Sequence, residues 1–203
     1  MEDQALKIIA DHASAGQKLR GIFFEQQAHL LKKAALTMAQ RLIDGGKLLL
    51  CGNGGSAADC QHLAAEFVNR FLMERPGLPA IALTTDTSIL TAVGNDYAYE
   101  KVFSRQVEAL GKSGDMLMAI STSGNSANVV AAVKMAKAKG LLTMALTGEG
   151  GGLLKDCDFL FAVPSKLTPL IQEIHLACEH LFCQLVDHYL FEDVAALKTD
   201  GQS

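Results

Sequence analysis

The stretch KLLLCGNGGSAADCQHLAAEF, residues 47–67, decides the fold because it joins an apolar run, a glycine-rich turn and a helical pattern. The short apolar run KLLLC at 47–51 is typical of a strand buried on both faces of a sheet. The turn at 52–56 leads into a helix, which Ser56 can cap and which we expect to reach about Arg75. A strand, a tight turn and a helix in this order predict one unit of a parallel α/β sheet.

The same alternation continues along the chain. Apolar runs at 80–83, 116–120, 142–146 and 159–163 predict further strands, and helical patterns lie between them at 88–93, 99–110 and 126–139. Thr168 as N-cap and Pro169 at the first helical position begin a final helix that we expect to end near Tyr189. The sequence therefore predicts an α/β fold, with a five-stranded parallel sheet sandwiched by helices.

The residues before the first strand form a separate arm. Two helices are predicted there, at 4–17 and 25–44, and neither can be a crossover within the sheet. Their leucine-rich faces either pack against a second copy, which predicts an oligomer, or cover the chain's own sheet. We expect one domain over 1–203, with N-terminal helices at 1–45, an α/β core at 46–192 and a frayed tail at 193–203.

Composition excludes several classes of protein. Acidic residues outnumber basic ones by 22 to 18, and the net charge of −4 argues against a nucleic-acid binder, which needs a cationic surface. The sequence shows neither a secretion signal nor an apolar run of the roughly 20 residues that span a membrane, so a cytoplasmic protein is expected. Five cysteines without a paired pattern are expected to be reduced and buried.

Two loops at predicted strand ends have the chemistry of a phosphate site. The turn at 52–56 offers glycines, and the turn at 121–126 offers the hydroxyls of Ser121, Thr122, Ser123 and Ser126 at a helix start. Hydroxyls and a helix dipole without Lys or Arg suit a phosphate monoester, bound reversibly. The alternative is that Ser126 only caps its helix and the rest is a polar turn.

Nucleotide sites fit these loops poorly. Residues 52–57 match G-x-G-x-x-A, but no acidic residue stands at the end of the second strand, where a dinucleotide site needs one. A P-loop needs a lysine, and neither loop contains one. Nicotinamide and nucleoside triphosphate cofactors are therefore not expected.

A possible metal site comes from two predicted helices. His62 and Glu66 are four residues apart and share one helix face, although such a pair is more often a solvated surface. Gln172 and His180 lie roughly 12 Å apart along the final helix and could meet one ion only by leaning together. Zinc suits these donors best. His175, Cys178 and Cys183 are expected to be structural.

Several blocks of the sequence, in order, resemble the bacterial phosphoheptose isomerases of the sugar isomerase (SIS) superfamily. They are GNGGSAADCQHLAAE at 52–66, VGND at 93–96, ISTSGNSANV at 120–129, ALTG at 145–148 and IQEIHLACEH at 171–180. The resemblance implies a flavodoxin-like SIS fold and a homotetramer with one zinc ion per subunit. It implies conversion of D-sedoheptulose 7-phosphate to D-glycero-D-manno-heptose 7-phosphate, the first step toward ADP-heptose for lipopolysaccharide core.

The same resemblance implies roles for individual residues. Glu66 and His180 would be the acid–base pair, and zinc would be bound by His62, Glu66, Gln172 and His180. The implied substrate-binding residues are Asn53, Gly54, Gly55, Ser56, Glu66, Asn95, Asp96, Ser121, Thr122, Ser123, Ser126 and Gln172.

One departure and one alternative accompany the resemblance. Some family members carry an Asp-Arg pair where this chain has Pro169-Leu170, so an ion pair from Arg70 to that aspartate is not possible here. The stretch 69–83 also resembles a non-enzymatic relative that binds the replication initiator. That regulator lacks acid–base residues at the positions of Glu66 and His180, and their presence here favours the enzyme.

Overall fold

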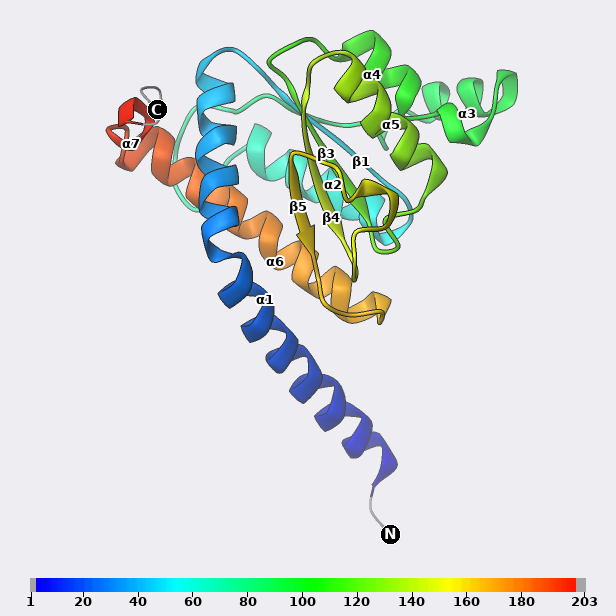
Figure 1. Ribbon diagram of the computed structural model, residues 1–203, viewed down its shortest axis with the longest axis vertical. Helices are drawn as coiled ribbons and strands as arrows, with labels where there is room; N and C mark the ends of the chain where they lie inside the picture. The colour runs from blue at the N-terminus through cyan, green and yellow to red at the C-terminus, as the bar shows by residue number, and fades with distance from the viewer. Residues whose placement is uncertain (1–2, 200–203) are drawn as a thin grey trace.

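The computed structural model describes residues 3–199 and has one sheet of five parallel strands (Figure 1). The strand order is β2-β1-β3-β4-β5. The strands are β1 (Leu48–Gly52), β2 (Ala80–Ala82), β3 (Met116–Ser121), β4 (Leu142–Thr147) and β5 (Phe159–Ala162). The predicted five-stranded parallel sheet is confirmed, and its order is that of flavodoxin-like folds.

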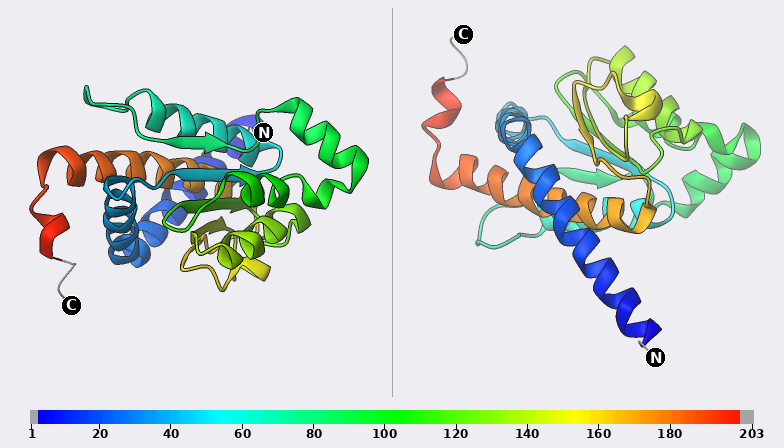
Figure 2. Two further views of the ribbon diagram at one scale, coloured as in Figure 1. Left: turned by 90° about the horizontal axis from the view of Figure 1, so that it is seen from above. Right: turned by 60° about the horizontal axis from the view of Figure 1, so that its bottom comes forward.

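Helices cover both faces of this sheet, as Figure 2 shows. The long helices are α1 (Gln4–Ile43), α2 (Gly55–Val68), α3 (Thr87–Asp96), α5 (Ala127–Ala138) and α6 (Thr168–Asp187). Shorter turns are η1 (Tyr99–Lys101), α4 (Ser104–Leu110), η2 (Gly152–Leu154), η3 (His188–Glu192) and α7 (Ala196–Thr199).

Side chains of alternate strand residues pack into two separate hydrophobic cores, one on each face of the sheet. Leu48 and Leu50 of β1 pack with α1, α2 and α6, whereas Leu49 and Cys51 pack with α3, α4 and α5. Both faces are apolar because side chains alternate along a strand that is covered twice. All five cysteine thiols are free and buried, as expected.

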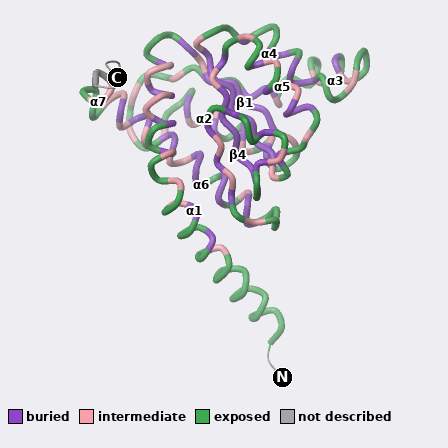
Figure 3. The backbone as a smooth tube through the Cα atoms, in the orientation of Figure 1, coloured by how far each residue is buried: buried purple, intermediate pink, exposed green. Residues whose placement is uncertain are grey.

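Helix α1 corrects the prediction of two N-terminal helices. It runs unbroken from Gln4 to Ile43, because Gly16 and Gly21 cost only about 1 kcal/mol each while Leu19 and Phe23 are buried against the core. Its second half covers the chain's own sheet. Its first three turns, up to about residue 15, are exposed, and its N-terminal end projects from the body (Figures 1 and 3).

Other boundaries also differ from the prediction. Helix α2 ends at Val68 instead of near Arg75, and η1 and α4 replace a continuous helix over 99–110. Helix α6 has Leu167 as N-cap, so Thr168 is its first residue and no side chain caps it. The predicted frayed tail contains α7, and residues 200–203 lie outside the described part. Within residues 3–199 no helix is long and apolar enough to cross a membrane.

The strand order also locates the site. Chain connections diverge on either side of the paired strands β1 and β3, and in open α/β sheets ligands bind at the carboxyl ends of strands at such a point. Gly52 ends β1 beside Ile120 of β3, so the two predicted phosphate loops start next to each other.

Candidate active site

The loop after β1 passes so close to α6 that its shape requires glycine. Gly54 has a φ of +55°, and a Cβ at Gly55 would lie 2.4 Å from Nε2 of Gln172. Helix α2 begins at Gly55 with Gly54 as its N-cap, so the expected capping by Ser56 is wrong. Ser56 is instead buried in the first turn. With no side-chain cap, the helix N-terminus keeps N–H groups for a ligand.

The loop after β3 gathers hydroxyls at the start of α5. Ser121 Oγ and Ser126 Oγ are hydrogen-bonded at 3.0 Å, and Ser123 Oγ accepts from the Asn125 N–H at 3.1 Å. Ser126 is the N-cap residue, but its side chain makes no capping hydrogen bond. This contradicts the interpretation of Ser126 as only a cap. Thr122 is half-buried and Ser123 is exposed, so the loop presents hydroxyls to solvent beside a helix N-terminus.

A third loop, which sequence reasoning missed, supports the hydroxyl loop. The Gly148 N–H donates to the Thr122 carbonyl at 2.9 Å, and the Leu153 N–H donates to the Gly124 carbonyl at 3.0 Å. Gly124 has a φ of +66°, and a Cβ there would lie 2.2 Å from the Gly151 carbonyl oxygen. The glycine-rich run at 148–152 therefore fixes the backbone of the candidate phosphate loop.

Asn53 and Asn128 join the two predicted loops. Asn53 Nδ2 donates to Asn128 Oδ1 at 2.9 Å, and Asn128 Nδ2 donates to Asn53 Oδ1 at 2.8 Å. Asn128 is buried and also accepts from the Val129 N–H at 3.0 Å. The hydroxyl of Tyr99 approaches Asn53 Oδ1 at 3.5 Å. Sequence reasoning had named Asn53 but not its partner.

His62, Glu66 and His180 lie together between α2 and α6. The Nε2 atoms of His62 and His180 are 2.9 Å apart, and Glu66 Oε1 is 3.9 Å from His62 Nε2. The two helices thus bring the predicted acid–base pair to the same nitrogen of one imidazole, within reach of a common small substrate. The ring of Phe71, which no sequence pattern singled out, stacks on His180 with 5.6 Å between centroids.

Gln172 does not share this cluster. Its amide lies against Gly55, at the opposite end of α2, and Gly55 precedes His62 by about 10 Å along the helix axis. Asn95 and Asp96 are also apart from it. They are exposed at the end of α3, where Asn95 Nδ2 donates to Asp96 Oδ1 at 2.9 Å.

The residues present suit zinc by type. Two imidazole nitrogens and a carboxylate are the donors that zinc prefers, and His62 and His180 already direct nitrogens at each other. Within residues 3–199, however, no group of three His, Cys, Asp or Glu side chains is arranged as a metal site.

Two buried titratable groups flank the cluster on α6. Burial, with a contribution from Asp59, raises the pKa of Glu179 to about 9, and neither of its carboxyl oxygens has a hydrogen-bond partner among the described residues. Burial lowers the pKa of His175 to about 4, and its Nε2 lies 3.0 Å from the Thr147 carbonyl. His175 is therefore structural, as expected. No pattern in the sequence pointed to Glu179.

Arg70 forms its contacts within its own segment of the chain, because the sequence has no aspartate just before Ile171 to pair with it. Its Nε contacts Glu74 Oε1 at 2.8 Å, and its Nη1 donates to the Phe71 carbonyl. The missing Asp-Arg pair is thus replaced by an exposed contact within the segment that follows α2.

Known proteins resemble this chain over almost its whole length. Residues 11–148 match the SIS domain family. The phosphoheptose isomerase of Nitratidesulfovibrio vulgaris (strain DSM 19637 / Miyazaki F) is 59% identical over 199 residues, covering 98% of this chain and 96% of that protein. The phosphoheptose isomerase of Desulfovibrio desulfuricans is 61% identical over 198 residues, covering 97% of this chain and 94% of that protein.

Solved structures give the same result. A phosphoheptose isomerase from Neisseria gonorrhoeae superposes with a TM-score of 0.85 at 46% identity, over 91% of this chain and 99% of that chain. One from Francisella tularensis superposes with a TM-score of 0.88 at 38% identity, over 92% of this chain and 100% of that chain.

The chain belongs to the SIS domain family. Within this family it belongs to the phosphoheptose isomerases, which its sequence relatives and structural neighbours share across almost their whole length. The resemblance drawn from the sequence blocks is confirmed, and none of these four relatives supports the replication regulator.

Proposed function

We propose that this chain interconverts D-sedoheptulose 7-phosphate and D-glycero-D-manno-heptose 7-phosphate, and that it supplies ADP-heptose synthesis for lipopolysaccharide core. The observation that carries the proposal is the convergence of Glu66 and His180 on His62, since an isomerase needs a base and an acid at one place. The relatives named phosphoheptose isomerase support the choice of substrate.

The phosphate would bind at the loop after β3. There the hydroxyls of Ser121, Thr122, Ser123 and Ser126 stand at the N-terminus of α5, whose dipole favours an anion. The loop after β1, tied to this one through Asn53, would bind the hydroxyls of the sugar.

The reacting carbons of the sugar need a second site, separate from the phosphate loop. A heptose 7-phosphate carries its phosphate and its reacting carbons at opposite ends of a seven-carbon chain. Glu66 and His180 lie away from the N-terminus of α2, which suits this separation. We assign Glu66 as the base that removes a proton from C1 and returns it at C2, through an enediol. His180 would move protons between O1 and O2, so that no net proton is gained or lost.

Zinc is part of this proposal. His62, Glu66 and His180 would hold the ion, and the resemblance adds Gln172, although the structure places its amide on Gly55. When bound, the ion would polarise the substrate's oxygens.

A homotetramer in the cytoplasm is the proposed form of the enzyme. The exposed first turns of α1 carry Leu6, Ile8 and Ile9, which are 64%, 60% and 64% exposed. Apolar side chains at this exposure are suited to an interface. The proposed surface is therefore the projecting N-terminal end of α1.

The test is direct. Purified protein is incubated with sedoheptulose 7-phosphate, with and without a chelator, while aldose formation and bound metal are measured. We expect aldose, loss of the rate after chelation, and recovery on adding zinc. No aldose under any condition would remove the isomerase proposal, whereas an unchanged rate in metal-free protein would remove zinc alone.

A further inference from the structure

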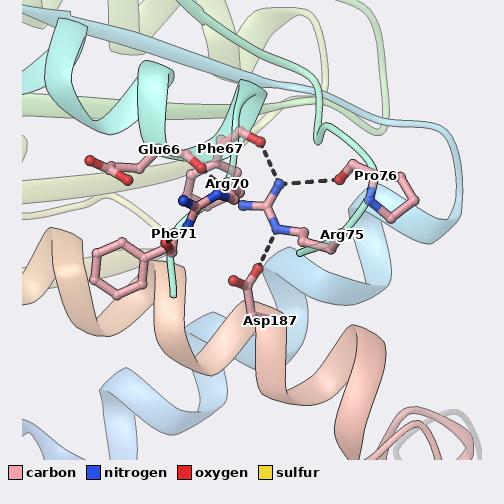
Figure 4. Close-up of polar contacts among 7 residues, drawn as sticks. All are labelled: Glu66, Phe67, Arg70, Phe71, Arg75, Pro76 and Asp187. Carbon is pink, nitrogen blue, oxygen red and sulfur yellow. Dashed lines mark hydrogen bonds and ion pairs between the residues drawn. The ribbon is translucent and has the colours of Figure 1, made fainter. Parts of the chain in front are cut away.

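Arg75 is buried between the C-terminal end of α2 and the C-terminal end of α6, the two helices that carry the acid–base pair. Its side chain is only 1% exposed. Its Nε donates to Asp187 Oδ1 at 2.7 Å, and its Nη2 and Nη1 donate to the carbonyls of Glu66 and Phe67 at 2.9 and 2.8 Å. Figure 4 shows this guanidinium lying between α2 and Asp187 of α6.

These contacts close the C-terminus of α2. The last carbonyls of a helix have no partner within it, and a cation there is favourable. The Ala65 carbonyl accepts from the Asn69 N–H, and the next two carbonyls accept from Arg75. The guanidinium therefore acts as the cap of α2.

The other end of the contact is the last residue of α6. Asp187 lies two helical turns beyond His180, on the same side of the helix. Arg75 thus links the backbone of Glu66 to the helix that carries His180. A planar guanidinium can bind two carbonyls and a carboxylate at once, which a lysine ammonium cannot reproduce in the same geometry.

The carboxylate of Glu66 has little else to hold it. Among the described residues, its carboxylate makes the 3.9 Å approach to His62, so its position depends on where the backbone of residue 66 is fixed. Because a displacement of about 1 Å can lower a rate about 100-fold, the cap controls whether the carboxylate meets its carbon.

We propose that Arg75 is a positioning residue for the isomerase reaction, acting through the backbone carbonyls of Glu66 and Phe67 and through Asp187. It touches neither phosphate loop, so its loss changes turnover and not substrate affinity. The inference rests on the proposed function, because it concerns the base of that reaction.

Three variants test this role: Arg75→Lys, Arg75→Met, and the double variant Arg75→Met/Asp187→Leu. The double variant removes both buried charges and so keeps the fold if Arg75→Met alone unfolds. We expect kcat to fall about 10- to 100-fold in the double variant and less in Arg75→Lys, with KM changed by less than about threefold.

Lys47→Met is the matched control. Lys47 Nζ contacts the buried Asp115 carboxylate at 2.5 Å, at the amino ends of β1 and β3, on the opposite edge of the sheet. This variant also removes the cation from a buried carboxylate, which keeps only its backbone N–H donors, and we expect it to lower the melting temperature while kcat stays within about twofold of wild type.

Different outcomes would overturn the positioning role of Arg75 and the proposed function. Unchanged kcat in the folded double variant, an equal loss of kcat in Lys47→Met, or a rise in KM alone would each overturn the positioning role. A wild-type protein that forms no aldose would instead overturn the proposed function, independently of Arg75.

Discussion

Asn53 and Asn128 exchange two hydrogen bonds between their side-chain amides, of 2.9 and 2.8 Å, and so lock the loop after β1 to the start of α5. The two residues reach each other because β1 and β3 are neighbours in the sheet. The loop that would bind sugar hydroxyls and the loop that would bind phosphate are therefore one rigid unit.

This pair predicts strong coupling between the two positions. Removing either amide leaves the amide group of the other without its partner for two hydrogen bonds, and an unsatisfied buried polar group costs about 1–3 kcal/mol. We expect Asn53→Ala and Asn128→Ala each to lower the free energy of unfolding, and the double variant to lose clearly less than the two together. Urea unfolding of the four proteins measures this coupling. Additive losses would show that the two amides act independently.

The hydroxyl loop predicts an effect on substrate affinity. Replacing Ser126 by Ala removes one hydroxyl from the proposed phosphate site, and hydrogen bonds to charged groups contribute about 1.5–3 kcal/mol. We expect KM to rise about tenfold or more, with weaker inhibition by inorganic phosphate and little change in kcat. Ser113→Ala, at the amino end of β3, is the control and should behave as wild type. An unchanged KM in Ser126→Ala would remove this hydroxyl from the site.

Replacing Glu66 is expected to lower kcat and to leave phosphate binding unchanged. Glu66→Gln keeps the size of the side chain and removes the base, so we expect kcat to fall by about 10²–10⁴ while phosphate inhibition stays unchanged. Steady-state kinetics with phosphate as competitor measure both quantities. Glu108→Gln, at an exposed ion pair on α4, serves as the control. Retained turnover in Glu66→Gln would assign the base to another residue.

Because His175 is buried in the neutral form, we expect the free energy of unfolding to fall at acidic pH. Its pKa is about 4 in the folded protein and near 6.5 when unfolded, so the unfolded chain binds the extra proton between these values. Its contribution is therefore fully present above about pH 6.5 and is lost as the pH falls toward 4, by about 2 kcal/mol between pH 7 and pH 5. Urea unfolding of wild type and His175→Gln at both pH values isolates it. Parallel pH dependence in the two proteins would contradict this assignment.

The sheet and its covering helices could be predicted from the sequence because their signals are local. The run at 48–51 is buried on both faces, and the Gly-rich turn after it starts a helix as expected. The end of α2 could not be predicted in this way. The helical pattern continues toward Arg75, but that side chain folds back onto the carbonyls of Glu66 and Phe67 and ends the helix at Val68.

The residues of the candidate site also differ in whether a local sequence signal points to them. Ser121, Ser126, Glu66 and His180 have recognisable residue types and spacing, and the fold places them at strand and helix positions where they can act. Asn128 and Arg75 carry no local signal, because their partners are far away in the sequence and meet them only after the strands pair. Gln172 is a candidate from the sequence, but its contact with Gly55 becomes visible only once α2 and α6 are packed.

The most direct measurement is the fate of the transferred proton. The reaction is run in deuterium oxide with sedoheptulose 7-phosphate, and the aldose is analysed for deuterium at C2. Because the Glu66 side chain is 25% exposed, the proton that it takes from C1 exchanges with solvent before it is returned. The account therefore predicts deuterium at C2 in the product of the wild-type enzyme, and labelled product formed about 10²–10⁴ times more slowly with Glu66→Gln. Aldose formed without any deuterium at C2, or labelled product from Glu66→Gln at the wild-type rate, would contradict the account.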